Sequence, residues 1–363
     1  MPLQKLYGHA VELLQQLIAV PSYSKNEEGT ADVLMQFLIT HGIHAERLRN
    51  NVWAINKYFD PAKPILLLNS HHDTVKPNPQ YTKDPFNPII ENDRLYGLGS
   101  NDAGGCLVSL VAAFIHFYNY PDLQYNLIMA ATAEEEISGH EGIELLLSNQ
   151  HFKSAIHNKE IDCAMVGEPT KMDLAVAEKG LMVLDCIAYG KAGHAAREEG
   201  TNAIYKALHD IEWFSTYQFK KVSEWLGPVK MSVTVINTEN KAHNMVPSQC
   251  SFVVDIRVTE MYTHEEIYET ICRHVSCNMT PRSMRLRSTG IATDHPLVLA
   301  GLATGKKCYG SPTSSDKALM PFPALKCGPG DSSRSHTPDE FIFLHEVKEG
   351  IQGYIQMLEK VIR

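Results

Sequence analysis

The sequence lacks any long apolar run. None of its hydrophobic stretches approaches the ~20 residues that a membrane-spanning helix needs. The first residues, MPLQKLYGHAVELLQQL, have the pattern of an amphipathic helix rather than of a signal peptide. We therefore expect a cytoplasmic protein with no membrane partner.

Positive charge and paired cysteines are also scarce. Lys and Arg number 33 against 42 Asp and Glu, which gives a formal net charge of −9. That balance does not attract polyanions, so neither nucleic acid nor an anionic membrane is expected as the main partner. The eight cysteines include no CxxC pair, which favours buried free thiols in a reducing cytoplasm over disulfides or a thiolate–zinc site.

Several catalytic motifs are missing as well. The segment GLATGKK (301–307) is one residue short of a P-loop and lacks the Ser or Thr after its lysine. The segment GLGSND lacks the third glycine of a dinucleotide fingerprint, and no GxSxG nucleophile elbow occurs. These absences disfavour nucleotide-dependent chemistry and a serine hydrolase.

The first half of the 363 residues alternates apolar strands with helices. This order predicts an α/β fold with a mostly parallel sheet covered by helices on both faces. Residues Ser24 to Glu27 form a capping-box pattern before a helix that Gly42 ends. The expected strands are PILLLNS (64–70), YNLIMAATA and DCAMVGE, and the expected helices are EEGTADVLMQFLITHG, GGCLVSLVAAFIHFYNY (104–120) and HEGIELLLSNQ.

The pattern changes at about Leu174 and resumes near Ala292. Between them, strands and two amphipathic helices follow the order β-α-β-β-α-β, which is typical of a ferredoxin-like α+β domain. The chain then ends in a long helix, EFIFLHEVKEGIQGYIQMLEKVI. We expect a larger domain over residues 1–173 and 290–363, interrupted by an inserted domain over residues 174–289.

Histidines and carboxylates follow the strands of the larger domain. Open α/β sheets place ligands beyond the carboxyl ends of their strands, so these side chains should share one rim. No Lys or Arg stands at the motif cores, and so many carboxylates repel one another unless a cation lies among them. Mixed imidazole and carboxylate ligands suit zinc, cobalt or manganese rather than calcium or magnesium. The residues are His71, His72, Asp73, Asp102, Glu134, Glu135, Glu136, Glu168 and His336.

Each of these residues alone has an ordinary structural explanation. Three adjacent acids can form the solvated first turn of a helix. Asp102 suits a Gly-rich turn, and a single histidine is commonly a surface or satisfied core residue. Their joint occurrence at successive strand ends is what favours a metal site.

Six ordered motifs resemble those of the dinuclear metallohydrolases that deacylate amino acids. They are SHHDTVKP, LYGLGSNDAGG, ATAEEEISG, MVGEPT, GKAGHAA and CGPGDSSRSHTPDEF. That family includes acetylornithine deacetylase, succinyl-diaminopimelate desuccinylase, aminoacylase and related exopeptidases, and the resemblance covers essentially the whole chain. The segments VGEPT and GPG…HTPDE are most similar to the acetylornithine deacetylase branch.

The resemblance implies a zinc-exopeptidase-like fold with two divalent metal ions, zinc or alternatively cobalt. It assigns His71 and Glu168 to one metal and Glu136 and His336 to the other. Asp102 would bridge both.

The resemblance also implies roles around the metals. Glu135 would be the general base, which takes a proton from water and returns it to the leaving amine. Asp73 would orient the imidazole of His71. Glu134 stands where the family usually has Asp and would be ancillary, and His72 is the residue most easily confused with His71.

The resemblance implies that the inserted domain is a lid and that two chains form a homodimer through it. His194, Asn244 and Arg257 match family positions that close over the substrate, with Arg257 holding its α-carboxylate through a bidentate fork. His194 would reach the site of the partner subunit. Two positions depart from the family pattern: Gly104 replaces a frequent basic residue, and Ser70 replaces a frequent glycine.

We therefore expect a metal-dependent amidohydrolase whose partner is a small N-acyl amino acid. N-Acetylornithine, in arginine biosynthesis, is the expected substrate. The alternatives are N-acetyl- or N-succinyl-citrulline or -ornithine, N-succinyl-diaminopimelate, and a dipeptide. A non-catalytic binding protein on the same fold is the alternative from a different class.

Overall fold

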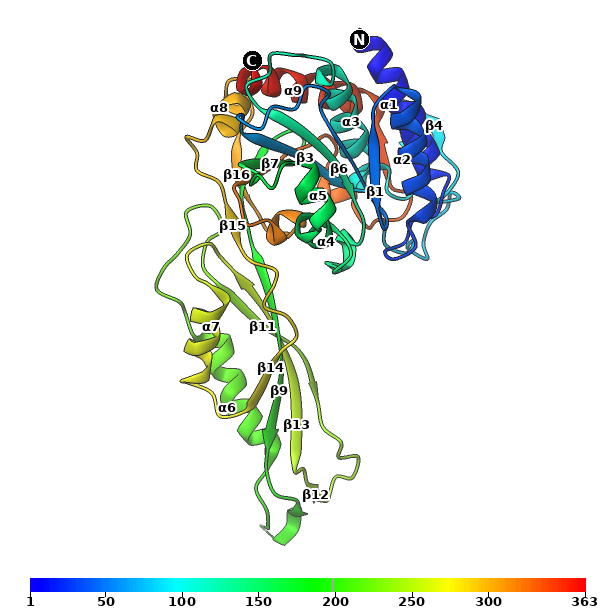
Figure 1. Ribbon diagram of the computed structural model, residues 1–363. Helices are drawn as coiled ribbons and strands as arrows, with labels where there is room; N and C mark the ends of the chain where they lie inside the picture. Colours follow the sequence, from blue (N-terminus) through cyan, green and yellow to red (C-terminus); the bar gives the residue numbers. More distant parts are fainter. Residues whose placement is uncertain (198) are drawn as a thin grey trace. The chain divides into compact units, whose positions relative to one another are not determined.

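The computed structural model describes residues 1–197 and 199–363 and contains two compact units (Figure 1). Unit 1 comprises Met1–Val176, Ile291–Tyr309 and Ser315–Arg363, and unit 2 comprises Ala177–Gly290 and Gly310–Ser314. Residues 310–314, expected in the larger domain, thus group with unit 2. In unit 2 the Lys179 amide donates to the Ser311 carbonyl and the Ser314 hydroxyl donates to the Lys179 carbonyl.

Unit 1 is built on a sheet with the strand order β1-β2-β6-β3-β7-β17-β8. The four strands β6, β3, β7 and β17 run parallel, whereas β1, β2 and β8 pair antiparallel at the two sides. The expected α/β fold with a mostly parallel central sheet is confirmed. The bounds are β1 Ala45–Leu48, β2 Asn51–Ile55, β3 Ile65–His71, β6 Asn126–Thr132, β7 Cys163–Val166, β8 Leu174–Glu178 and β17 Ala324–Lys326.

Helices bury both faces of this sheet, which explains why β3 is wholly apolar along ILLL. Leu66 and Leu68 face one core with α1, α2, α3, α8 and α9. Ile65 and Leu67 face a second core with α4 and α5. The helices are α1 Leu3–Ile18, α2 Glu28–Thr40, α3 Gly105–Phe117, α4 Ile143–Ser148, α5 Gln150–Ala155, α8 Pro296–Leu302 and α9 Leu344–Ile362.

Three local expectations about unit 1 were wrong. The Ser24 hydroxyl does not cap α2, because it donates to the Asp73 carboxylate instead. The expected helix over HEGIELLLSNQ divides at Asn149, whose side chain caps α5. The final helix begins at Leu344, because Phe341–Phe343 forms β18 in a small antiparallel sheet with β5 (Arg94–Tyr96) and β4 (Ile89–Glu91).

Unit 2 has an antiparallel sheet with the order β11-β13-β9-β14. Helices α6 (Ala203–Thr216) and α7 (His264–Cys272) pack on one face, where they meet the inward residues of β9 and β13. This is the ferredoxin-like arrangement that the order of elements predicts. The strands of this sheet are β9 Gly180–Tyr189, β11 Lys230–Asn237, β13 Gln249–Val258 and β14 Asn278–Pro281. Two further short strands, β15 (Thr289–Gly290) and β16 (Cys308–Ser311), each pair with β8.

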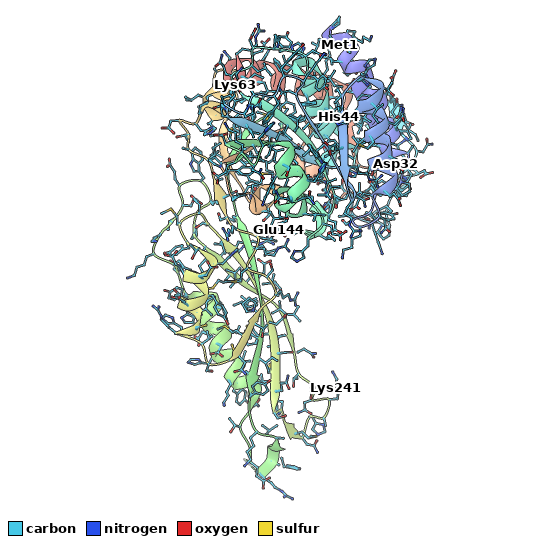
Figure 2. All side chains as sticks on the ribbon, in the orientation of Figure 1. Met1, Asp32, His44, Lys63, Glu144 and Lys241 are labelled. Atoms are coloured by element: carbon cyan, nitrogen blue, oxygen red, sulfur yellow. The ribbon has the colours of Figure 1, made fainter. Side chains whose placement is uncertain are left out.

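A short two-stranded antiparallel sheet belongs to unit 2. Strand β10 (Gly193–His194) pairs with β12 (Met245–Val246), and Lys241 marks the loop that leads into β12 (Figure 2). Across residues 1–197 and 199–363, no helix combines the length and the apolar character needed to cross a membrane.

Candidate metal centre

The carboxyl ends of the unit 1 strands bring five expected ligands into two groups. Each residue offers one ligand atom, and within each group these atoms all lie within 4.8 Å of one another. The first group is His71, Asp102 and Glu168, and the second is Asp102, Glu136 and His336. Asp102 belongs to both groups, so its carboxylate lies between them.

In the first group, the imidazole of His71 is surrounded by acids. His71 Nε2 lies 3.4 Å from Asp102 Oδ1 and 3.8 Å from Glu168 Oε1. His71 is 1% exposed, and its Nε2 has no hydrogen-bond partner among the described residues. A buried polar atom without a partner destabilises the fold unless a bound group, such as a cation, interacts with it.

The second group is more open to solvent. His336 Nε2 lies 3.0 Å from Glu136 Oε2 and 3.7 Å from Asp102 Oδ2. The His336 side chain is 53% exposed, whereas that of Glu136 is 8% exposed. This histidine comes from the loop between β17 and β18, so its position depends on how that loop is held.

Both groups fit a divalent metal. Ligands about 2.0–2.2 Å from a tetrahedral metal lie roughly 3.3–3.6 Å from one another. The ligand-to-ligand distances of 3.0–3.8 Å bracket that separation. His71 Nε2, buried and unpaired, is the atom that a cation would complete.

The shifted pKa values also indicate that this site attracts positive charge. Burial alone would lower the pKa of His71, but the carboxylates of Glu135, Asp102 and Asp73 raise it well above its usual value. The hydrogen bond to Glu136 raises the pKa of His336 to about 9, against the effect of burial. Both imidazoles therefore favour the positively charged form among these acids.

The three consecutive glutamates are held by their backbone. The amide of Glu134 donates to Glu27 Oε1 at 3.2 Å. The amides of Glu135 and Glu136 donate to the two oxygens of Asp73, at 3.0 and 3.2 Å. The buried carboxylates of Glu27 and Asp73 thus fix the turn that carries the three glutamates.

Asp73 also contacts His71. His71 Nδ1 lies 3.0 Å from the Asp73 carbonyl oxygen and 3.3 Å from its Oδ1. The main chain of Asp73 therefore orients the ring, and its carboxylate binds the glutamate turn and the Ser24 hydroxyl. The sequence expectation was that the carboxylate of Asp73 orients the imidazole; the main-chain contact and the hydrogen bonds to the glutamate turn were not expected.

Glu134 and Glu135 point to different surroundings. Glu134 has a left-handed backbone (φ 56°), and its Oε2 accepts from the Glu141 amide at 3.2 Å. Glu135 Oε2 lies 3.8 Å from His71 Nε2, although Glu135 belongs to neither ligand group of the described residues. Burial raises the pKa of Glu135 well above its usual value, with His71 opposing and Glu168 and Asp316 reinforcing the shift.

Four buried residues that hold the site were missed or given no role by the sequence expectation. The sequence offered Glu27 only as part of a capping box and Glu340 only as the last acid of HTPDEF. A pattern of residue types does not distinguish a buried carboxylate that binds amides from one in solvent. These residues are Glu27, Asn101, Asp316 and Glu340.

His72 lies beside the metal ligands but faces away from them. Its Nδ1 lies 2.9 Å from the Thr30 hydroxyl and its Nε2 lies 2.8 Å from the Asn50 carbonyl oxygen. Burial lowers the pKa of His72 to about 4. Both ring nitrogens therefore have protein partners, and His72 is a core histidine.

The two departures from the family pattern have local explanations. The Ser70 hydroxyl donates to the carbonyl of Gly167 at 2.8 Å and so ties the end of β3 to the residue before Glu168. A Cβ atom on Gly104 would lie 2.5 Å from the Gly99 carbonyl oxygen and 2.7 Å from Leu14 Cδ1. The backbone therefore leaves no room for a side chain at Gly104.

The three expected substrate residues lie in unit 2, and the structure does not bring them together. His194 and Asn244 are exposed neighbours, since the Ala195 amide donates to the Asn244 carbonyl at 3.0 Å. Arg257 lies near the other end of β13, eight residues and about 26 Å from Gln249. Its guanidinium forms a fork with Asp255 at 2.9 and 3.0 Å, so a substrate carboxylate would compete with Asp255.

The sequence of the chain is similar to those of known proteins. The model of peptidase family M20/M25/M40 matches residues 67–360. A succinyl-diaminopimelate desuccinylase from Stenotrophomonas maltophilia is 26% identical over 96% of this chain and 97% of that protein. Succinyl-diaminopimelate desuccinylase 2 from a Ruegeria species is 25% identical over 73% of this chain and 69% of that protein.

The fold is shared with solved structures of the same family. A dinuclear metal-binding peptidase of the M20 family from Bacillus subtilis superposes with a TM-score of 0.72 at 13% identity, covering 98% of each chain. Because the family model spans most of the sequence and the fold agrees over nearly its whole length, the chain belongs to peptidase family M20/M25/M40 and is a metal-dependent amidohydrolase.

Proposed function

We propose that the protein hydrolyses the amide bond of an N-acyl amino acid with the help of two divalent metal ions, zinc or alternatively cobalt. One observation carries the proposal. Two groups of ligands share the Asp102 carboxylate, and Glu135 lies beside the first group without belonging to either. A pair of metals sharing a carboxylate, with a further carboxylate alongside to move a proton, is an arrangement suited to amide hydrolysis.

In this proposal the side chains have separate tasks. His71 and Glu168 would hold one metal, Glu136 and His336 would hold the other, and Asp102 would be a ligand of both. When bound, the metals supply Lewis acidity, which polarises the amide carbonyl and makes water more acidic.

Glu135 moves the proton. Its carboxylate takes a proton from the attacking water and transfers it to the nitrogen of the leaving amine. Burial raises the pKa of Glu135 above its usual value, which makes the carboxylate a better proton acceptor. Asp73 supports this step because it holds the Glu135 amide and thus fixes where the carboxylate can reach.

Two acyl amino acids are proposed as substrates, each on a specific observation. N-Acetylornithine is favoured by the segments VGEPT and GPG…HTPDE, which gives the protein a place in arginine biosynthesis. N-Succinyl-diaminopimelate is favoured by the curated relatives, which are named for its hydrolysis. The remaining alternative substrates are N-acetyl- and N-succinyl-citrulline, N-succinylornithine and dipeptides.

We further propose that unit 2 is a lid that joins two copies of the chain. Strand β11 lies at the edge of its sheet, and its Val235 and Ile236 are each 53% exposed. On α6, Tyr205 is 71% and Leu208 is 49% exposed. An apolar sheet edge of this kind supports pairing with a second chain.

The test is a release assay over these N-acyl amino acids, in which the freed amine is measured with zinc, cobalt or manganese added. Preference for acetylornithine, acetylcitrulline or a succinylated substrate identifies the acyl group and the amino acid. Release from none of them by the metal-loaded protein would contradict the proposal and favour a binding role.

Metal removal provides the second test. We expect exhaustive chelation to abolish the activity and zinc or cobalt to restore it, because Glu135 has no sufficiently acidic water to deprotonate without them. Elemental analysis should find two metals per active chain. A fully active preparation with less than one metal per chain would rule out the assignment.

A further inference from the structure

The two loops that carry Asp102 and His336 exchange hydrogen bonds through two buried side chains. Asn101 is 0% exposed and Glu340 is 2% exposed. Each belongs to one loop and binds the backbone of the other. Asn101 directly precedes Asp102, and Glu340 follows His336 by four residues.

Glu340 binds the loop that carries Asp102. Its Oε1 accepts from the amides of Asn101 at 2.8 Å and Asp102 at 2.9 Å. Its Oε2 accepts from the amide of Gly99 at 3.1 Å. Three backbone amides thus bind the Glu340 side chain to the loop that carries Asp102.

Asn101 binds the loop that carries His336. Its Oδ1 accepts from the Asp331 amide at 3.0 Å, and its Nδ2 donates to the Asp331 carbonyl at 3.1 Å. The same Nδ2 lies 3.3 Å from the hydroxyl of Ser335, the residue before His336. Both the oxygen and the nitrogen of the Asn101 side chain therefore bind the same segment, Asp331 to Ser335.

We propose that Asn101 and Glu340 are positioning residues that set the distance between Asp102 and His336, and thereby the affinity for the second metal. The inference rests on the proposed two-metal site. Neither side chain belongs to the ligand groups found among the described residues, so both act through their neighbours.

The second metal should depend on these residues more than the first. His71 ends β3, and Glu168 follows β7, which pairs with β3 in parallel up to Asn69 and Val166. The sheet itself therefore fixes two ligands of the first metal. His336 lies on a loop, and its distance from Asp102 depends on the hydrogen bonds between the two loops.

The experiment is a titration of the metal-free protein with Co²⁺, followed by the absorption of the bound ion. We expect the unaltered chain to bind two Co²⁺. We expect Asn101→Ala and Glu340→Gln to weaken the second Co²⁺ by about 10–100-fold, the usual effect of removing a partner that orients a ligand. The first Co²⁺ should bind nearly as before, and the double variant should lose less than the product of the two effects.

Two matched variants control for a general loss of stability. Asn126 is 1% exposed, and its side chain, like that of Asn101, accepts a hydrogen bond from one backbone amide and donates to two oxygens. The donor is the Asp60 amide, and the acceptors are the carbonyls of Asp60 and Lys63. Asp210 is a buried carboxylate in unit 2 that accepts from the amides of Ser276 and Cys277. We expect Asn126→Ala and Asp210→Asn to lower the melting temperature and leave both Co²⁺ affinities unchanged.

The outcomes separate this inference from the function on which it rests. Two Co²⁺ in the unaltered chain, with unchanged affinity for the second in Asn101→Ala, would overturn the positioning role and leave the two-metal site intact. Equal weakening of both ions, or the same loss in Asn126→Ala, would also overturn it. Fewer than two Co²⁺ in the unaltered chain would remove the proposed function as well. If Glu340→Gln does not fold, Asn101→Ala decides the outcome.

Discussion

At the scale of residues, the protein places three consecutive glutamates in three surroundings. Glu134 bonds the Glu141 amide, Glu135 lies beside His71, and Glu136 lies beside His336. Adjacent residues can differ in this way because their amides are fixed by Glu27 and Asp73 while their side chains leave the turn in different directions.

This arrangement predicts opposite effects for two neighbouring substitutions. Glu135→Ala should keep both metals and lower kcat by about 10²–10⁴-fold, because proton transfer is lost while the ligands remain. Glu134→Ala should leave kcat within a few-fold and cost about 1 kcal/mol of stability, because it removes one hydrogen bond. Steady-state kinetics, metal analysis and thermal unfolding of both variants provide the check. If Glu134→Ala is the inactive one, the general base has been assigned to the wrong residue.

The candidate ligands His71, Glu136 and Glu168 could be placed at one rim from the sequence because each lies at or just after the end of an apolar strand, whereas Asp102 and His336 lie further along their loops. The residues that orient them could not. Glu27 lies in a segment that resembles a helix cap, and Asn101 lies in a Gly-rich loop. Their hydrogen-bond partners, Glu134 and Asp331, are 107 and 230 residues away along the chain. Only the folded chain brings such partners together, so no local pattern identifies them.

At the scale of elements, long periodic segments were predicted well and their ends less well. Helix α3 and strands β3 and β6 lie where the apolar runs place them. The segment 340–343 was expected to be helical, but Phe341–Phe343 forms β18 because β5 offers it a pairing partner and Phe341 and Phe343 pack against Arg94. A tertiary partner thus overrides a local helical pattern.

The start of α3 allows a direct test of close packing. Gly104→Ala should destabilise the protein by about 1–3 kcal/mol, because the added Cβ would overlap the Gly99 carbonyl and Leu14. Gly8→Ala is the matched control inside α1, where a Cβ would meet nothing within 4 Å. That variant should gain up to about 1 kcal/mol from helix propensity. Denaturant unfolding measures both, and a stabilising Gly104→Ala would contradict the packing described here.

Helix α7 should make the stability of unit 2 depend on pH. His264 is the first residue of α7; burial lowers its pKa, and Arg287 adds to that shift while the Met284 carbonyl and Glu265 oppose it. The neutral form is therefore favoured in the fold. Its stabilisation is complete above the unfolded pKa of about 6.5 and is lost as pH falls through the lower folded pKa.

The variant His264→Gln should remove this contribution. Urea unfolding between about pH 5 and pH 8 should show stability falling with acid, and His264 can contribute at most ~1.4 kcal/mol per pH unit to that slope. The slope should be shallower in His264→Gln, whose amide can still donate to the Met284 carbonyl. If stability depends on pH equally in both proteins, the pKa of His264 is the same in the folded and unfolded states, which would contradict the prediction.

At the scale of the whole molecule, the metal ligands and the expected lid residues belong to different units. All five candidate ligands and Glu135 lie in unit 1, whereas His194, Asn244 and Arg257 lie in unit 2. Within unit 2, His194 is an exposed residue of β10, the exposed Asn244 directly precedes β12, and Arg257 lies near the other end of β13. The two ends of unit 2 therefore cannot both be close to the same point.

This separation leads to the prediction that His194 acts in the site of a partner subunit. The tetrahedral intermediate develops an oxyanion, and one donor aimed at it contributes about 2.7–4 kcal/mol in comparable sites. His194→Ala should therefore lower kcat by roughly 10²–10³-fold with both metals retained. Glu135→Ala should be inactive for a different reason, the loss of the general base.

Mixing the two inactive proteins under conditions of subunit exchange gives a dimer in which one site has both an intact Glu135 and, from the partner subunit, an intact His194. Activity should return towards one quarter of that of the unaltered protein, because half of the exchanged dimers are mixed and each has one complete site. Exchange is verified with differently tagged copies, and mixing either variant with itself is the control. If exchange occurs and no activity returns, His194 acts within its own chain or has no part in the reaction.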